Sequence, residues 1–115
     1  MNDALVQLAE RCEAATGPSF ELEREIADAV WRAKWGKRRP KDIAPQPCTS
    51  SLDAALMLVP EGALTWHAGK HMKTGEGQAY ILVPGQRDPI YAVAATPALA
   101  LTAAALRALA KEPTP

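Results

Sequence analysis

The chain has 115 residues, a mass of 12.3 kDa and a formal net charge of zero, with 13 basic and 13 acidic side chains. Apolar residues make up 48% and charged residues 23%, which is ordinary for a folded domain and excludes an intrinsically disordered chain. Zero net charge argues against a protein that coats nucleic acid or an anionic membrane. The length predicts one domain, residues 1–115.

The first third of the chain predicts a helical hairpin, residues 3–33. Apolar side chains recur at helical spacing in both halves, at Leu5, Leu8, Cys12 and Ala15 and then at Leu22, Ile26, Ala29 and Val30. Gly17-Pro18 separates the two helices, and Ser19 is placed to cap the second one. Periodicity is then lost, and a basic, proline-rich connection over residues 34–48 is expected.

Residues 49–111 predict a helix-sheet-helix unit. Ser50-x-x-Asp53 forms a capping box ahead of a short helix, with an apolar stripe at Leu52, Ala55, Leu56 and Val59. Residues 64–73, 78–83 and 90–94 are expected to be strands joined by two hairpin turns. The middle strand is apolar on both sides, so both of its faces should be covered. The fold class is α+β, a three-stranded antiparallel sheet packed by helices in the order α-α-α-β-β-β-α.

The last predicted helix, residues 97–110, is the most apolar part of the chain. Thr96 is a good N-cap, and Pro97 suits the first helical position. From Ala98 to Leu106 only Thr102 is polar, so the helix should be buried on more than one side. Because such a surplus of apolar surface is unusual on a soluble monomer, we expect the protein to form a homo-oligomer through helix 97–110. The run is too short to span a membrane.

Two segments together resemble a known family. Residues 49–62, followed by Trp66, and residues 95–108 are similar to small phage and prophage proteins described as a phage α-β-α sandwich domain; Glu13-Ala14-Ala15-Thr16-Gly17-Pro18 is similar as well. The resemblance implies a phage origin and a compact α+β fold. Its motifs are helix caps and packing runs, so it carries over neither catalytic residues nor a cofactor.

No motif predicts catalysis or a metal site. His67 and His71 lie four residues apart on a predicted strand, a span of about 13 Å, which is too long for one ion with bonds of about 2.0–2.1 Å. Cys12 and Cys48 lack metal or redox spacing, and Cys12 is expected to be a buried thiol. No glycine pattern suits a phosphate-binding loop. We therefore predict neither an enzyme nor a cofactor, and keep a small hydrolase as a remote alternative.

The strongest polar feature is the basic segment, residues 32–41, which has six cations and no acid and a net charge of +6. Its candidate binding residues are Arg32, Lys34, Trp35, Lys37, Arg38, Arg39 and Lys41. Arginine forks grip oxyanions, and Trp35 is suited to stack on a base. The alternative is a solvated loop that offsets residues 1–31, where seven acids and two bases give −5.

These features predict a small phage accessory protein that acts by binding rather than catalysis. One hypothesis is counter-defence, in which the protein sequesters a nucleotide signal or blocks a host defence protein. The expected partners are then an anionic small ligand or a host protein, besides a second copy of the chain. The alternative is a nucleic-acid-binding regulator that uses residues 32–41. No leader opens the chain, so we expect it in the cytoplasm of the bacterial host cell, away from the membrane.

Overall fold

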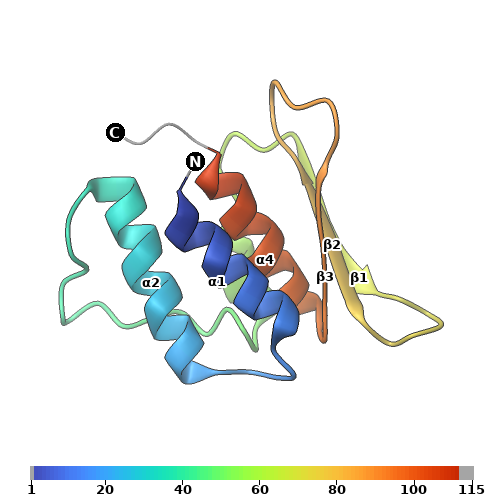
Figure 1. Cartoon of the computed structure of the whole chain (residues 1–115), viewed down its shortest axis with the longest axis horizontal. Coiled ribbons are helices and arrows are strands. Elements are labelled where there is room, and N and C mark those ends of the chain that lie inside the picture. The colour runs from blue at the N-terminus through green and yellow to red at the C-terminus, as the bar shows by residue number, and fades with distance from the viewer. Residues whose placement is uncertain (1, 112–115) are drawn as a thin grey trace.

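The computed structural model describes residues 2–111 and has the predicted α+β architecture (Figure 1). The elements are α1 (Asp3–Ala14), α2 (Phe20–Trp35), α3 (Leu52–Leu56), β1 (Thr65–Lys70), β2 (Gly77–Leu82), β3 (Ile90–Ala94) and α4 (Pro97–Ala110). The element order α-α-α-β-β-β-α is thus confirmed. Figure 1 shows α4 between α1 and the sheet, with α2 on the far side of α1.

Helix α4 is the centre of the fold. It begins as predicted, with the Thr96 hydroxyl accepting a hydrogen bond from the Leu99 N–H at 3.2 Å and Pro97 in the first turn. It contacts each of the other six elements, and every side chain from Ala98 to Ala110 except Arg107 is buried. The chain itself therefore covers the apolar surface from which self-association through helix 97–110 was inferred. Self-association stays a prediction, but an exposed apolar face on this helix no longer supports it, because that face is buried within the chain.

The sheet has the order β1-β2-β3, and both strand pairs are antiparallel. Burial alternates along β2: Ala79 and Ile81 are buried against α4, whereas Tyr80 and Leu82 on the other face are only partly buried. The prediction that both faces of this strand are covered is wrong, because all the helices lie on one side of the sheet (Figure 1). On the open face, Tyr80 instead stacks on His67 of β1, with ring centroids 5.3 Å apart.

Three boundaries differ from the sequence expectation. The second helix runs to Trp35, two residues beyond the predicted hairpin, and the first strand is shorter than expected. The N-cap of α3 is Ser51, whose hydroxyl accepts a hydrogen bond from the Ala54 N–H at 3.2 Å. The predicted cap, Ser50, instead belongs to the turn in which its N–H and hydroxyl both donate to the Pro47 carbonyl.

Gly77, at the start of β2, lies against the beginning of α4. A Cβ atom at Gly77 would stand 2.0 Å from the Thr96 carbonyl carbon, which is far inside van der Waals contact. We expect Gly77→Ala to destabilise the fold by at least the ~1–3 kcal/mol typical of overpacking. Gly62→Ala, where a Cβ atom meets nothing within 4 Å, is the control and should stay within about 0.5 kcal/mol. Equal urea midpoints for the two variants would contradict the close contact.

Leu106 tests the burial of α4, because its side chain is fully buried. Leu106→Ala should lower the free energy of unfolding by about 2–5 kcal/mol, the usual result of emptying a buried leucine site. Leu64 is 66% exposed, so Leu64→Ala should change stability by less than about 0.5 kcal/mol. Thermal melting of both variants checks this. A Leu106→Ala protein that melts within a degree of the parent would contradict the central position of α4.

Candidate functional site

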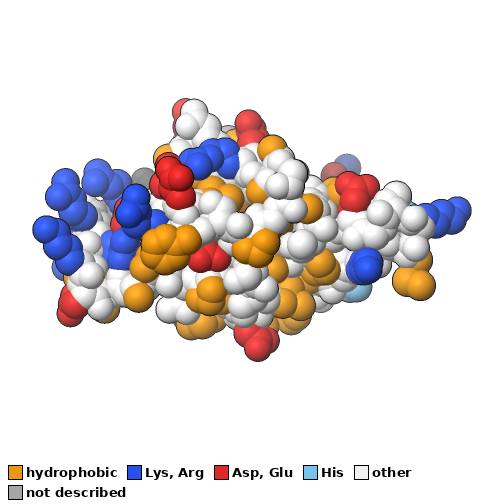
Figure 2. Space-filling view, turned by 90° about the horizontal axis from the view of Figure 1, so that it is seen from below, with side chains coloured by type: hydrophobic (Ala, Val, Ile, Leu, Met, Phe, Trp, Pro, Cys, Tyr) orange, Lys and Arg blue, Asp and Glu red, His pale blue; other side chains and the backbone are white. Residues whose placement is uncertain are grey.

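The basic segment starts on the last turn of α2 and then folds back. Gly36 ends the helix in the left-handed conformation, with φ at +70°, and its N–H donates to the Arg32 carbonyl at 2.8 Å. Glycine adopts this conformation without the steric cost that a Cβ atom brings. The turn directs residues 37–41 away from the helix axis. In Figure 2 basic side chains gather at one end of the molecule, the end where this loop lies in Figure 1.

Arg39 fixes the loop in place. Its Nε donates to the Asp28 carboxylate of α2 at 2.8 Å, and its Nη1 donates to the Ile43 carbonyl. The Arg39 side chain is consequently only 12% exposed. Of the seven predicted binding residues, Arg39 is thus engaged in holding the loop against α2.

A cleft of ≈570 Å³ lies between α1, α2 and this loop. We call it the basic cleft; its charged lining residues are Arg11, Glu25, Asp28, Arg32, Arg38, Arg39 and Lys41. Five cations against two carboxylates give this lining a net charge of +3. A concave surface with such an excess of one charge attracts ligands of the opposite sign.

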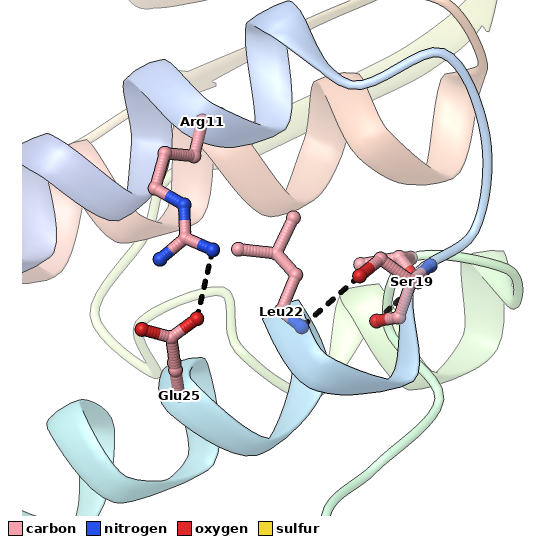
Figure 3. Close-up of polar contacts among 5 residues, drawn as sticks. Arg11, Ser19, Leu22 and Glu25 are labelled. Atoms are coloured by element: carbon pink, nitrogen blue, oxygen red, sulfur yellow. Dashed lines mark hydrogen bonds and ion pairs between the residues drawn. The ribbon is translucent and has the colours of Figure 1, made fainter.

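Both carboxylates of the basic cleft are already paired. Arg11 reaches from α1 to Glu25 on α2 at 2.8 Å (Figure 3), and Asp28 pairs with Arg39. The hydrogen bond from Arg11 lowers the pKa of the Glu25 carboxyl and raises the pKa of Arg11. Within residues 2–111, Arg32, Arg38 and Lys41 have no salt-bridge partner. Three exposed cations therefore remain free to meet an anion.

The remaining predicted residues lie elsewhere. Lys34 and Trp35 line a second, smaller cavity of ≈250 Å³ between α2, α3 and the connection that joins them, and Arg39 lines both cavities. Lys37 lines neither of these two cavities. The side chains of the basic segment are therefore divided between two cavities, with Lys37 in neither, whereas the sequence suggested one binding surface.

Sequence reasoning missed Arg11 and the buried polar group beneath α2. Glu23 is 7% exposed, and its Oε2 accepts hydrogen bonds from the Thr49 hydroxyl at 2.5 Å and the Thr49 N–H at 3.2 Å. The Thr49 hydroxyl oxygen also accepts from the Ser19 N–H at 3.0 Å. In Figure 3 Ser19 caps α2 through the Leu22 N–H at 3.1 Å, close to this group. No local signal connects Glu23 with a residue 26 positions away.

Searches of family models, curated proteins and solved structures find no match to this chain. The phage resemblance therefore stays a prediction. Across the described part of the chain, no helix is long and apolar enough to cross a membrane. In the same residues, no group of three or more His, Cys, Asp or Glu side chains is placed to hold a metal ion.

The two cysteines give a prediction on pH. Cys12 and Cys48 are both buried free thiols, and burial raises the pKa of Cys12 to about 12 and that of Cys48 to about 11. An unfolded thiol ionises near pH 8.5, so only the unfolded state gains from ionisation as the pH rises further. The contribution of the protonated thiols to the free energy of unfolding is therefore fully present below about pH 8, and it is lost as the pH rises from about 9 towards 11.

Urea unfolding between pH 7 and 10.5 measures this fall, with Cys12→Ala/Cys48→Ala as the control whose decline should be shallower. In the native protein at pH 8, both thiols should react with Ellman's reagent only as fast as the chain unfolds. Rapid labelling of either thiol in the native state would show that it is not buried.

Proposed function

We propose that the protein is a non-enzymatic binding protein that holds a small phosphate-bearing anion in the basic cleft. The observation that carries this proposal is the set of three unpaired cations, Arg32, Arg38 and Lys41, around one cleft of ≈570 Å³. Guanidinium groups form strong paired hydrogen bonds to phosphate oxygens, and ammonium groups add a compact charge. Gly36 and Arg39 support the proposal, because they hold the loop in position before any ligand arrives.

A small anion suits this surface better than a long nucleic acid. The cleft cations stand beside helices that bear seven acids against two bases in residues 1–31, and the whole chain has no net charge. A long polyanion would meet that acidic surface as soon as it left the cleft, whereas a compact ligand would not. A nucleic-acid-binding regulator is therefore the second candidate, favoured only by the net charge of the basic segment itself.

The biological setting rests on the resemblance to phage and prophage proteins. In an infected bacterial cell, a stable protein that binds a phosphate-bearing signal lowers its free concentration without any chemistry. We propose counter-defence of this kind, by sequestering a nucleotide signal, with the blocking of a host defence protein as the other form. Mass spectrometry under native conditions on protein taken from infected cells would report any retained ligand or partner.

The cleft is tested with inorganic tripolyphosphate as the probe, by isothermal titration calorimetry. Each lost charge-assisted contact typically weakens binding by about tenfold, so Arg32→Gln/Arg38→Gln/Lys41→Gln should bind at least about 100-fold more weakly than the parent. Lys37→Gln/Lys70→Gln/Lys73→Gln changes the net charge equally outside the cleft, and should bind almost as the parent does. Equal losses in the two triple variants would overturn the proposal.

The salt dependence of duplex DNA binding separates the two candidates. A protein that neutralises duplex phosphates shows a slope of log K against log salt near −0.9 for each contact. For random-sequence duplex DNA we expect a slope shallower than about −3. A steeper slope that Arg32→Gln reduces by about one would contradict the small-anion proposal and favour the nucleic-acid regulator.

A further inference from the structure

The second cavity beside the basic segment has the character of a binding pocket. We call it the α2–α3 pocket; it has a volume of ≈250 Å³ and is lined mainly by apolar side chains, including Ile26, Val30, Trp31, Trp35, Met57 and Leu58. Two charged side chains and a buried carboxylate join them: Lys34, Arg39 and Glu23. An apolar cavity with a few polar groups is the usual form of a small-molecule site. Its volume is below the roughly 300–1,000 Å³ of sites for drug-sized ligands, so the pocket suits one small aromatic group, either a single ring or two fused rings.

Two tryptophans form an aromatic wall of the pocket. Trp31 and Trp35 lie one helical turn apart, with ring centroids 4.4 Å apart and planes inclined at 41°. Trp35 is 55% exposed, and Met57 of the same lining is 68% exposed. Exposed aromatic surface beside a cavity is where a flat, π-rich ligand gains most by stacking. The Lys34 ammonium lies 6.0 Å from the Trp35 ring centroid, so a cation stands next to this wall.

Two polar groups among the residues that line the pocket, the Glu23 Oε1 atom and the Trp31 indole N–H, have no hydrogen-bond partner in the described part of the chain. Within residues 2–111, the hydrogen bonds to the Glu23 carboxylate both use Oε2, which leaves Oε1 as an acceptor. The indole N–H of Trp31 is buried and has no acceptor among the same residues. Buried polar groups normally find partners, so one that lacks a partner calls for an explanation. A ligand would have to bring an N–H donor for the carboxylate and, after a small shift of the Trp31 side chain, a lone pair for the indole.

A nucleobase combines these requirements. It is flat and aromatic, has one to two rings, and carries N–H donors next to ring-nitrogen or carbonyl acceptors on one edge. A hydrocarbon ligand would leave the Glu23 Oε1 atom and the indole N–H without partners. An alkylammonium ion offers no acceptor for the indole and would meet the positive charges of Lys34 and Arg39. Carboxylates recognise amino and imino N–H groups of bases in the same way elsewhere.

The position of Arg39 connects this pocket to the basic cleft, because it lines both cavities. We propose that the α2–α3 pocket holds the base of a nucleotide and that Arg32, Arg38 and Lys41 of the basic cleft hold its phosphate. The placement of the phosphate rests on the proposed function of the basic cleft, whereas the placement of the base rests on the α2–α3 pocket alone. Together the two placements identify the ligand as a nucleoside phosphate rather than a simple polyphosphate.

The test compares GMP, AMP, CMP, UMP, their nucleosides and inorganic phosphate by calorimetry on the full chain. At least one nucleotide should bind about tenfold or more tightly than inorganic phosphate. Trp66→Phe leaves Trp31 and Trp35 as the only tryptophans, so quenching of the remaining fluorescence by that nucleotide should follow the same isotherm. If no nucleotide exceeds inorganic phosphate, the inference is overturned.

Substitutions in and outside the α2–α3 pocket test where the base binds. Trp35→Ala should weaken nucleotide binding by about tenfold and leave tripolyphosphate binding unchanged, since the base rather than the phosphate loses its contact. Phe20→Ala removes another exposed aromatic side chain, from the first turn of α2 and outside the pocket, and should change neither affinity. Glu23→Gln should reduce the preference among the four bases. If that variant does not fold, Trp35→Ala alone decides, because Trp35 is half-exposed.

The two proposals fail differently. If tripolyphosphate binding depends on Arg32, Arg38 and Lys41 but nucleosides add nothing, the cleft stands and the base site is overturned. If nucleosides bind and Trp35→Ala weakens them while the cleft variants have no effect, the base site stands and the phosphate site is overturned. Equal weakening by Trp35→Ala and Phe20→Ala would overturn the base site as well.

Discussion

The burial of α4 is the constraint on which the rest of the structure depends. A helix without a polar face needs neighbours all round, and here all six other elements contact it. Alanines let those neighbours approach closely, and Gly77 meets the start of the helix without a side chain. Because α1, α3 and the sheet occupy the positions around α4, α2 is left at the periphery, where it contacts only α1 and α4 among the helices and strands. Both cavities lie along α2, where the fold leaves surface uncovered.

A buried polar junction compensates for the sparse packing of α2. Thr49 joins the turn at Ser19 and the Glu23 carboxylate, and the Thr102 hydroxyl of α4 donates to the neighbouring Cys48 carbonyl at 2.9 Å. Hydrogen bonds to a buried charge are worth more than ordinary ones, and removing a partner would leave that charge unsatisfied. The junction therefore holds the α2–α3 connection against the core. Glu23 and Cys48 of this junction also line the α2–α3 pocket, so the contacts that stabilise the connection also position part of the candidate site.

Local signals predicted most of the fold, and long-range contacts decided what they missed. Thr96, Pro97 and Ser19 act as expected because a cap needs only its own first turn. Coverage of the middle strand could not be inferred from its apolar character, since Tyr80 finds a partner in His67 on the open face. The division of the basic segment follows from helical phase. At 3.6 residues per turn, Arg32 and Lys34 differ by about 200° around α2 and so line different cavities. Arg11 joins Arg32 only through the packing of α1 on α2.

The charge around the basic cleft is a feature that folding alone does not explain. Arg32, Arg38 and Lys41 are brought to one concavity without carboxylate partners, and like charges held close together repel each other. The three side chains are exposed to water, which screens this repulsion, while Arg39 and Gly36 hold the backbone of the segment against α2. A multivalent anion in this cleft would meet several cations that have no carboxylate partner, and this excess of positive charge is the reason for proposing the cleft as a binding site.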